Sequence, residues 1–129
     1  MISRIVEPEL DGHLGPIFEE IAREFVLELL ARGELPGLDV GSWWSTDGQH
    51  EIDIVTVARK DITNVGTVKW RSSPLGRDVY EDLAGHAAAL GVDESIPWLM
   101  IGRGGVEDSL LAAEPHVRGF SADDLYQTT

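Results

Sequence analysis

Apolar residues in the N-terminal quarter of the chain recur three or four positions apart, which is the period of an amphipathic helix. The series begins after Pro16, a residue that the first turn of a helix tolerates. It continues at Phe18, Ile21, Ala22, Phe25 and Leu29. Gly33 then follows, as is typical of a helix end. The pattern predicts a helix over residues 15–32, preceded by an irregular arm over residues 1–13 that holds one proline and one glycine.

The next part of the chain alternates short apolar runs with turn residues, as an antiparallel meander does. The run 51–58 is mostly β-branched and contains no Gly or Pro, so it predicts a strand. A strand over 38–44 precedes it across the hairpin sequence Ser-Thr-Asp-Gly, and a strand over 65–70 follows the polar turn 59–63.

Helical periodicity returns in the second half of the chain. A second predicted helix ends at Gly91, and one face of it is lined by Val79, Leu83, Ala87 and Leu90. A short buried strand over 96–101, a loop over 102–105, a short helix over 106–113 and a final strand over 117–120 complete the series.

A helix that crosses over between the third and fourth strands requires those strands to run parallel. The sequence therefore predicts an α/β fold with a central mixed sheet flanked by helices, in the order αβββαβ plus a short helix and a final strand. The side chains expected to be largely buried are Phe18, Ile21, Phe25, Ile54, Val68, Leu83 and Leu99.

Composition narrows the classes of function. A chain of 129 residues with 43% hydrophobic residues has room for one domain with its own core. It has no cysteine, which excludes thiolate metal sites and fits the cytoplasmic location that we expect. No apolar stretch approaches the roughly 18 residues of a membrane span, and no leader pattern is present, so we expect no membrane association. The net charge of −13 opposes direct contact with a phosphate backbone. We interpret the acidity as a source of solubility, the alternative being a cationic partner.

Two charged residues interrupt the apolar strands of the middle region. Asp53 lies within an otherwise apolar run, where a carboxylate is rare unless it is paired or binds a metal. Lys69 lies in the next strand. Side chains two residues apart share one face of a strand, so Lys69 should lie beside Thr67, and Glu51 beside Asp53. The pattern indicates a shared site. The alternatives are an ion pair between Asp53 and Lys69 that only fixes the hairpin, and an edge strand whose lysine discourages aggregation.

These residues stand in an ordered set of motifs over residues 12–126: Gly15-x-x-Phe18-Glu19, Val40-Gly41-Ser42-Trp43-Trp44, Glu51-Ile52-Asp53-Ile54-Val55, Gly66-Thr67-Val68-Lys69-Trp70 and Gly104-Gly105-Val106. The set resembles the C-terminal domain of unknown function of archaeal-type AAA+/STAND ATPases, a branch of the PD-(D/E)XK nuclease-like superfamily. The resemblance implies a restriction-endonuclease-like fold over residues 14–129, with residues 1–13 as an entry arm or linker remnant. It also implies an upstream ATPase module in a longer protein, which could bring nucleic acid to the domain. The chain itself lacks the phosphate-binding loop Gly-x-x-x-x-Gly-Lys-Ser/Thr, so we expect no nucleotide cofactor.

The resemblance also implies a site. Asp53 and the backbone carbonyl of Val68, with help from Glu51, would hold Mg²⁺ or Mn²⁺, and Lys69 would stabilise the attacking water and the charge that develops on phosphorus. The family pattern has glutamate where this chain has Thr67, and a neutral hydroxyl is a weaker ligand than a carboxylate. We therefore expect a degenerate phosphodiesterase site with a weakly bound ion.

The first predicted helix offers a further carboxylate to this site. Projection at about 100° per residue places Glu19 at the edge of the apolar face and Glu20 well outside it. Glu19 thus joins Asp53, Thr67 and Lys69 as a candidate catalytic residue. Two alternatives stay open. One is an active Mg²⁺- or Mn²⁺-dependent nuclease that recruits Glu19 or Glu51 as the missing ligand, and the other is a non-catalytic protein-interaction domain.

Other polar and aromatic residues have simpler interpretations. Packing in or beside the sheet is favoured over base stacking for Trp43, Trp44 and Trp70. The spacing of His86 with the apolar face of the second helix favours a core histidine, and His50 forms no metal cluster with its neighbour Glu51. Surface ion pairs are favoured over phosphate contacts for Arg71 and Arg77.

Overall fold

The computed structural model describes residues 2–127 and, within them, the side chains of residues 15–126. The elements in chain order are α1 (Ile2–Ala31), β1 (Asp39–Trp44), β2 (Glu51–Ala58), β3 (Asp61–Lys69), α2 (Arg77–Leu90), β4 (Trp98–Gly102), α3 (Asp108–Ala113), β5 (Val117–Phe120) and α4 (Ala122–Gln127). The strands form one five-stranded sheet in the order β1-β2-β3-β4-β5. Pairing is antiparallel from β1 to β3 and parallel from β3 to β5. The predicted α/β class and mixed sheet are confirmed, and α4 is a helix that the pattern did not predict.

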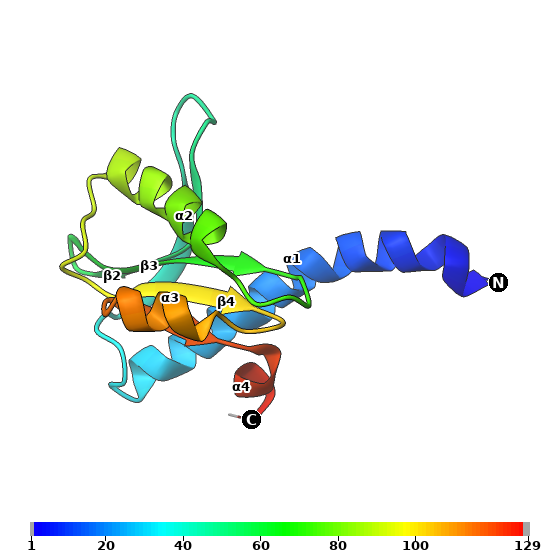
Figure 1. Cartoon of the computed structure of the whole chain (residues 1–129). Helices are drawn as coiled ribbons and strands as arrows, with labels where there is room; N and C mark the ends of the chain where they lie inside the picture. Colours follow the sequence, from blue (N-terminus) through cyan, green and yellow to red (C-terminus); the bar gives the residue numbers. More distant parts are fainter. Residues whose placement is uncertain (1, 128–129) are drawn as a thin grey trace.

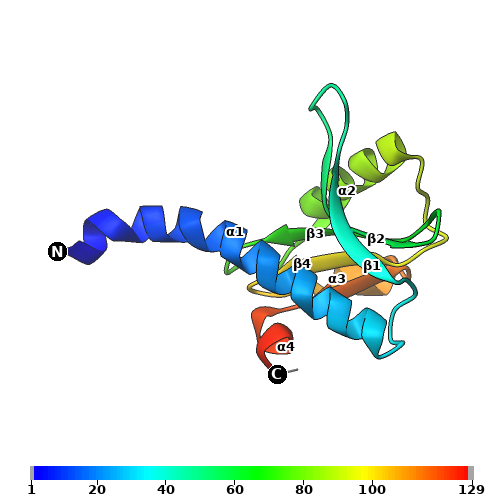
Figure 2. The same ribbon diagram turned by 180° about the vertical axis from the view of Figure 1, so that it is seen from behind.

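Helices cover both faces of the sheet, with α2 and α3 in front of it in Figure 1 and α1 across the opposite face in Figure 2. The core on the α1 face joins that helix to three strands through Phe18, Phe25, Ile54, Val68 and Leu99. The core on the α2 face is built around Val65, Leu83, Met100 and Leu110. The predicted core is confirmed except at Ile21, which is only partly buried and packs against the α1-face core.

The first helix is longer than the predicted one. α1 begins at Ile2, so the expectation of an irregular segment over residues 1–13 was wrong. Figure 1 shows that the N-terminal part of α1 extends past the sheet. Pro8 and Pro16 both lie within α1, where a proline lacks the N–H for a helical hydrogen bond, but neither ends the helix. Although α1 is long, no helix within the described residues is apolar enough over a sufficient length to cross a membrane.

The turn between β2 and β3 is tighter than expected. β3 begins at Asp61, so the segment 59–63 is not all turn, and Arg59 adopts a positive φ of 61°. The polar residue that obscured this strand is Asn64, which is fully buried and donates hydrogen bonds to the Pro36 carbonyl and to Thr56 Oγ1, each at 2.7 Å. Tertiary contacts thus satisfy the amide nitrogen of a side chain that strand propensity alone disfavours, while its buried Oδ1 has no partner among the described residues.

The strands β2 and β3 separate at one end of the hairpin. Their pairing extends only to Ile54 opposite Gly66, whereas β3 continues to pair with β4 as far as Lys69. On its other edge β2 contains a β-bulge, because Asp53 and Ile54 together face the single residue between Gly41 and Trp43 of β1. Bulges re-aim side chains and end pairing. The result is an open end of the hairpin, here called the fork, with Asp53 at its apex.

Candidate functional site

The carboxylate of Asp53 occupies the fork and replaces a missing backbone acceptor. Its Oδ2 accepts a hydrogen bond from the backbone N–H of Val68 at 2.8 Å and one from Thr67 Oγ1 at 3.3 Å. Val68 and Thr67 are only 5% and 9% exposed. Because β2 no longer pairs there, the carboxylate satisfies a buried amide that would otherwise have no partner.

Two oxygens face the fork and are candidate ligands for a cation. Among the described side chains, no hydrogen bond or ion pair engages Asp53 Oδ1. The N–H and C=O of one residue lie on the same edge of a strand. The carbonyl of Val68 therefore faces the fork, as its N–H does.

A cavity of about 240 Å³ opens beside the fork. It brings together four of the predicted residues with three from α2, and its lining is Glu51, Asp53, Thr67, Lys69, Asp82, Leu83 and His86. Asp53 and Lys69, which were expected to share one site, both line this cavity.

Glu19 approaches the fork from α1. Burial raises the pKa of the Glu19 carboxyl above its ordinary value, and the negative charge of Asp53 raises it further. Arg23 lowers the same pKa; it lies 3.7 Å from Glu19, and its Nη1 donates to the backbone carbonyl of Asp53 at 3.4 Å. Glu51 and Lys69 act on Glu19 more weakly. The predicted residues from α1, β2 and β3 therefore share one electrostatic environment.

Lys69 is exposed and stands in an interior strand. β3 is the third strand of the five, so the edge-strand interpretation of this lysine was wrong. Within residues 15–126 it forms no ion pair with Asp53 or with any other carboxylate. Its ammonium is thus free to meet an anion at the cavity.

The oxygen donors at the fork fit a hard divalent cation that keeps several waters. Asp53 Oδ1 and the Val68 carbonyl are hard ligands, with Glu51 and Glu19 nearby, and Mg²⁺ commonly uses only one or two carboxylates. No group of three or more His, Cys, Asp or Glu side chains gathers tightly enough to hold a metal within the described part of the chain. Thr67 contributes no anionic ligand, and its hydroxyl is bonded to Asp53. The residues present are consistent with low affinity.

Sequence reasoning missed Arg23, Asp82 and the arrangement of His86. Asp82 and His86 are four residues apart on α2, which places them on one helix face, and that spacing was the available signal. His86 was expected in the core, but it is only partly buried and its Nδ1 lies 2.9 Å from Nδ1 of His50. The two histidines connect the β1–β2 turn to α2.

The remaining candidates behave largely as interpreted. Trp43 and Trp70 pack against the two cores, whereas Trp44 is 61% exposed and does not. Arg71 and Arg77 form ion pairs with carboxylates, at 3.7 Å and 2.8 Å respectively.

Comparison with known proteins places the chain in a family. Residues 1–81, which run from α1 through β3 into α2, match DUF234, described as archaea bacterial proteins of unknown function. The chain belongs to this family. An uncharacterized protein of Methanocaldococcus jannaschii is 32% identical over 95 residues, which cover 69% of this chain and 21% of that protein. The chain thus spans about a fifth of the length of this relative. No solved structure matches the chain.

Proposed function

We propose that this DUF234 domain is a PD-(D/E)XK nuclease-like module with a degenerate, metal-dependent phosphodiesterase site at the fork. The observation that carries the proposal is the position of Asp53. One of its oxygens is held by Val68 and Thr67, its other oxygen has no partner among the described side chains, and an unpaired Lys69 lines the same cavity.

Each residue at the fork has a distinct role in this proposal. Asp53 and the Val68 carbonyl hold Mg²⁺ or Mn²⁺, with Glu51 contributing through water. The bound ion would polarise a phosphoryl oxygen and lower the pKa of a coordinated water. Lys69 stabilises negative charge on the phosphate that enters the cavity. Thr67 holds the Asp53 carboxylate in place by a hydrogen bond and supplies no charge.

Two properties of the chain argue for weak catalysis by the domain alone. A threonine replaces the second carboxylate expected at the metal, so the ion binds loosely. The net charge of −13 repels a nucleic-acid backbone. We expect little cleavage of plasmid DNA or single-stranded RNA in Mg²⁺ or Mn²⁺. Robust cleavage that Asp53→Ala abolishes would show that Thr67 does not impair the site.

A place within a longer protein accounts for both weaknesses. The archaeal relative is about five times as long as the segment that it shares with this chain, which supports the proposal of further modules. The resemblance in the sequence motifs points to an upstream ATPase module, and such a module could supply the contacts to nucleic acid that the acidic domain lacks.

An active nuclease that recruits Glu19 is the second candidate, because of the electrostatics of that residue. The raised pKa of Glu19 reflects burial together with repulsion from Asp53 and Glu51. A divalent cation between these carboxylates would remove the repulsion. Glu19→Gln should then abolish metal-dependent cleavage in the active protein, whereas the degenerate site predicts no cleavage to lose.

The proposal is tested by restoring the missing ligand. Thr67→Glu adds a carboxylate beside Asp53 at a position that is 9% exposed, so without metal it should lower stability by a few kcal/mol, about 1–3. Added Mn²⁺ should raise the melting temperature of this variant in proportion to its occupancy of the folded state. Thr67→Gln is the matched control, with a similar shape and no charge.

Thermal melts of the wild type and both variants, with and without Mn²⁺, decide the matter. A metal-dependent gain that is confined to Thr67→Glu, and that is lost when Asp53→Asn is combined with it, supports the site. Equal responses of the glutamate and glutamine variants would contradict it, and the protein-interaction alternative would then take first place.

A further inference from the structure

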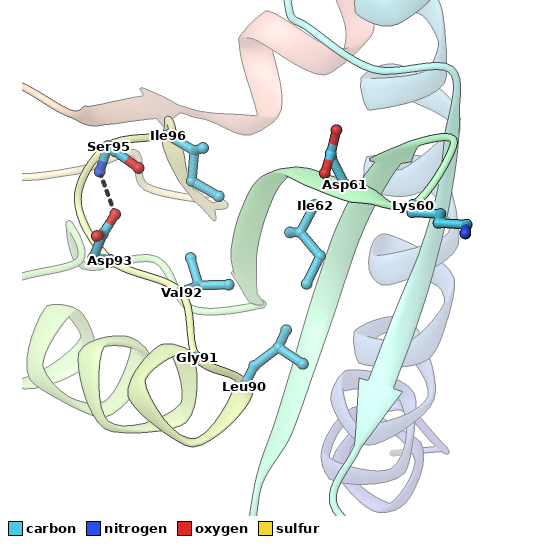
Figure 3. Close-up of a pocket in the computed structure, with 9 residues that line it drawn as sticks. All are labelled: Lys60, Asp61, Ile62, Leu90, Gly91, Val92, Asp93, Ser95 and Ile96. Atoms are coloured by element: carbon cyan, nitrogen blue, oxygen red, sulfur yellow. Dashed lines mark hydrogen bonds between the residues drawn. The ribbon is translucent and has the colours of Figure 1, made fainter.

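A groove whose lining mixes aliphatic side chains with polar and acidic ones lies at the opposite end of the β2–β3 hairpin from the fork. A cavity of about 350 Å³ is enclosed by the β2–β3 turn, the C-terminal end of α2 and the segment that follows α2. Figure 3 shows four partly exposed aliphatic side chains turned toward this space, which are Ile62, Leu90, Val92 and Ile96. A second cavity of about 500 Å³ shares the residues Val92, Asp93 and Ser95 with the first and extends along Ala84 and Ala88 of α2.

The rim of this groove is negative. Asp61 and Asp93 lie at the first cavity and Glu94 at the second, and all three are exposed. Asp93 accepts a hydrogen bond from the Ser95 backbone N–H at 2.9 Å, which favours its ionised form. The one basic residue of the lining, Lys60, has its ammonium turned away from the aliphatic side chains in Figure 3.

The end of α2 adds to this negative potential. The carbonyl end of a helix carries partial negative charge, and α2 has no basic residue in its last turn to offset it. The helix is closed by Gly91 at a positive φ of 82°, and this residue lines the same cavity. A cation in the groove would therefore meet two carboxylates and the carbonyl end of a helix.

A ligand that fits must combine an aliphatic body with a positive charge. Lysine and arginine side chains do so, since their stems cover apolar surface while the charged end stays near water. The cavity volume lies within the usual range of binding pockets, about 300–1,000 Å³. We propose that this groove binds a segment of a partner protein in which a lysine or arginine is flanked by aliphatic residues. The net charge of −13 would favour its approach.

The first test titrates the isotopically labelled full chain with a short synthetic peptide that carries one arginine between two leucines. Amide shifts should be confined to residues 60–62 and 84–98. A peptide with glutamine in place of the arginine should bind about tenfold more weakly, because it lacks the charge-assisted contact. Spermidine serves as a second probe that carries charge and methylene groups but no peptide.

The second test alters the rim without altering the fold. Asp61→Asn combined with Asp93→Asn should weaken the arginine peptide by about tenfold. The amide oxygen of the second change can still accept the Ser95 hydrogen bond. The matched control combines Glu24→Gln with Asp123→Asn, two exposed positions on α1 and α4, so both double variants change the net charge from −13 to −11. The control should bind as the wild type does, and so should Asp53→Asn at the fork.

Several results would overturn the inference. These are an absence of shifts at millimolar peptide, equal binding of the glutamine peptide, and equal losses in the rim variant and its control. Binding of spermidine at the same residues and as tightly as the arginine peptide would assign the groove to polyamines instead of a partner protein.

Discussion

Replacing Asp53 by alanine tests whether its carboxylate holds the fork together. The change removes the acceptor of the Val68 N–H at 2.8 Å and of the Thr67 hydroxyl at 3.3 Å. Val68 is 5% exposed, so its amide loses a partner where water has little access. An unsatisfied buried donor costs about 1–3 kcal/mol. Loss of the Asp53 charge also relieves its repulsion of Glu19, which is partly exposed, and this relief is worth at most about 1 kcal/mol.

The net expectation for Asp53→Ala is a loss of about 1–2 kcal/mol in the free energy of unfolding at neutral pH. For a chain of 129 residues this corresponds to a melting temperature lower by about 3–10 °C. Equilibrium unfolding in urea, with an unchanged slope against denaturant, measures the difference directly.

Asp53→Asn is the control that distinguishes the hydrogen-bonding role of Asp53 from the role of its negative charge. Its amide oxygen can accept the same hydrogen bonds, so its stability without metal should stay within about 0.5 kcal/mol of the wild type, although neutral acceptors are weaker. If Asp53→Ala is as stable as the wild type, the Val68 amide has another acceptor and Asp53 does not hold the fork. If alanine and asparagine lose stability equally, the charge and not the hydrogen bonds is responsible.

Three further changes test other parts of this account. Glu19→Gln should raise stability at neutral pH by up to about 1 kcal/mol. Because the pKa of Glu19 is raised in the folded state, this gain should be absent below the unfolded value of 4.5 and should appear as the pH rises through the folded-state pKa. Thermal melts across this pH range measure the gain. Gly66→Ala should destabilise by about 1–3 kcal/mol in urea unfolding, since the new Cβ would lie 2.8 Å from Leu99 Cβ; wild-type stability would mean that β4 can shift. Tyr80→Phe should cost about 1 kcal/mol by removing a hydroxyl bonded to a carboxylate and an imidazole. The pKa of Tyr80 is raised from 10.0 to about 12, by burial first and by the nearby carboxylate second, so the wild type should lose stability as the pH rises from about 10 to about 12. Tyr80→Phe should lack this alkaline loss, and absorbance during unfolding would follow it.

Local periodicity predicted the elements that pack along one face. The apolar series of α2 lies within the observed helix, because its face is covered by the sheet along its length. The N-terminal part of α1 was missed although apolar residues recur there three or four positions apart, because Pro8 and Gly12 favoured an irregular segment. The start of β3 was obscured by Asn64, whose hydrogen-bond partners come from two other segments.

Some of the charged residues at the fork could be predicted from the sequence. Asp53 and Lys69 were recognised because each is a charged residue in an apolar strand. The β-bulge at Asp53 was not predictable, because it depends on how β2 aligns with β1. Arg23, Asp82 and His86 reach the region only through the packing of α1 and α2 on the sheet, which no spacing within one strand reveals.

The hydrogen bond from Thr67 gives a physical reason why the proposed metal site would bind its ion weakly. Two carboxylates at one position repel each other unless a proton or a cation lies between them. A glutamate in place of Thr67 would set such a pair beside Asp53, in a position that is 9% exposed, and the domain would then need metal to be stable. A hydroxyl instead donates to Asp53 at 3.3 Å and stabilises the carboxylate without an ion.

Asp53 and Lys69 therefore differ in how strongly each supports the proposed function. The fold itself explains Asp53, because the carboxylate satisfies the amide of Val68 whether or not a metal binds. A scaffold that has lost its chemistry would still retain this residue. Lys69 lines a cavity with three carboxylates, and among the described residues it pairs with none of them. Within the proposed function, its unpaired ammonium is the group that would meet an anion entering the cavity.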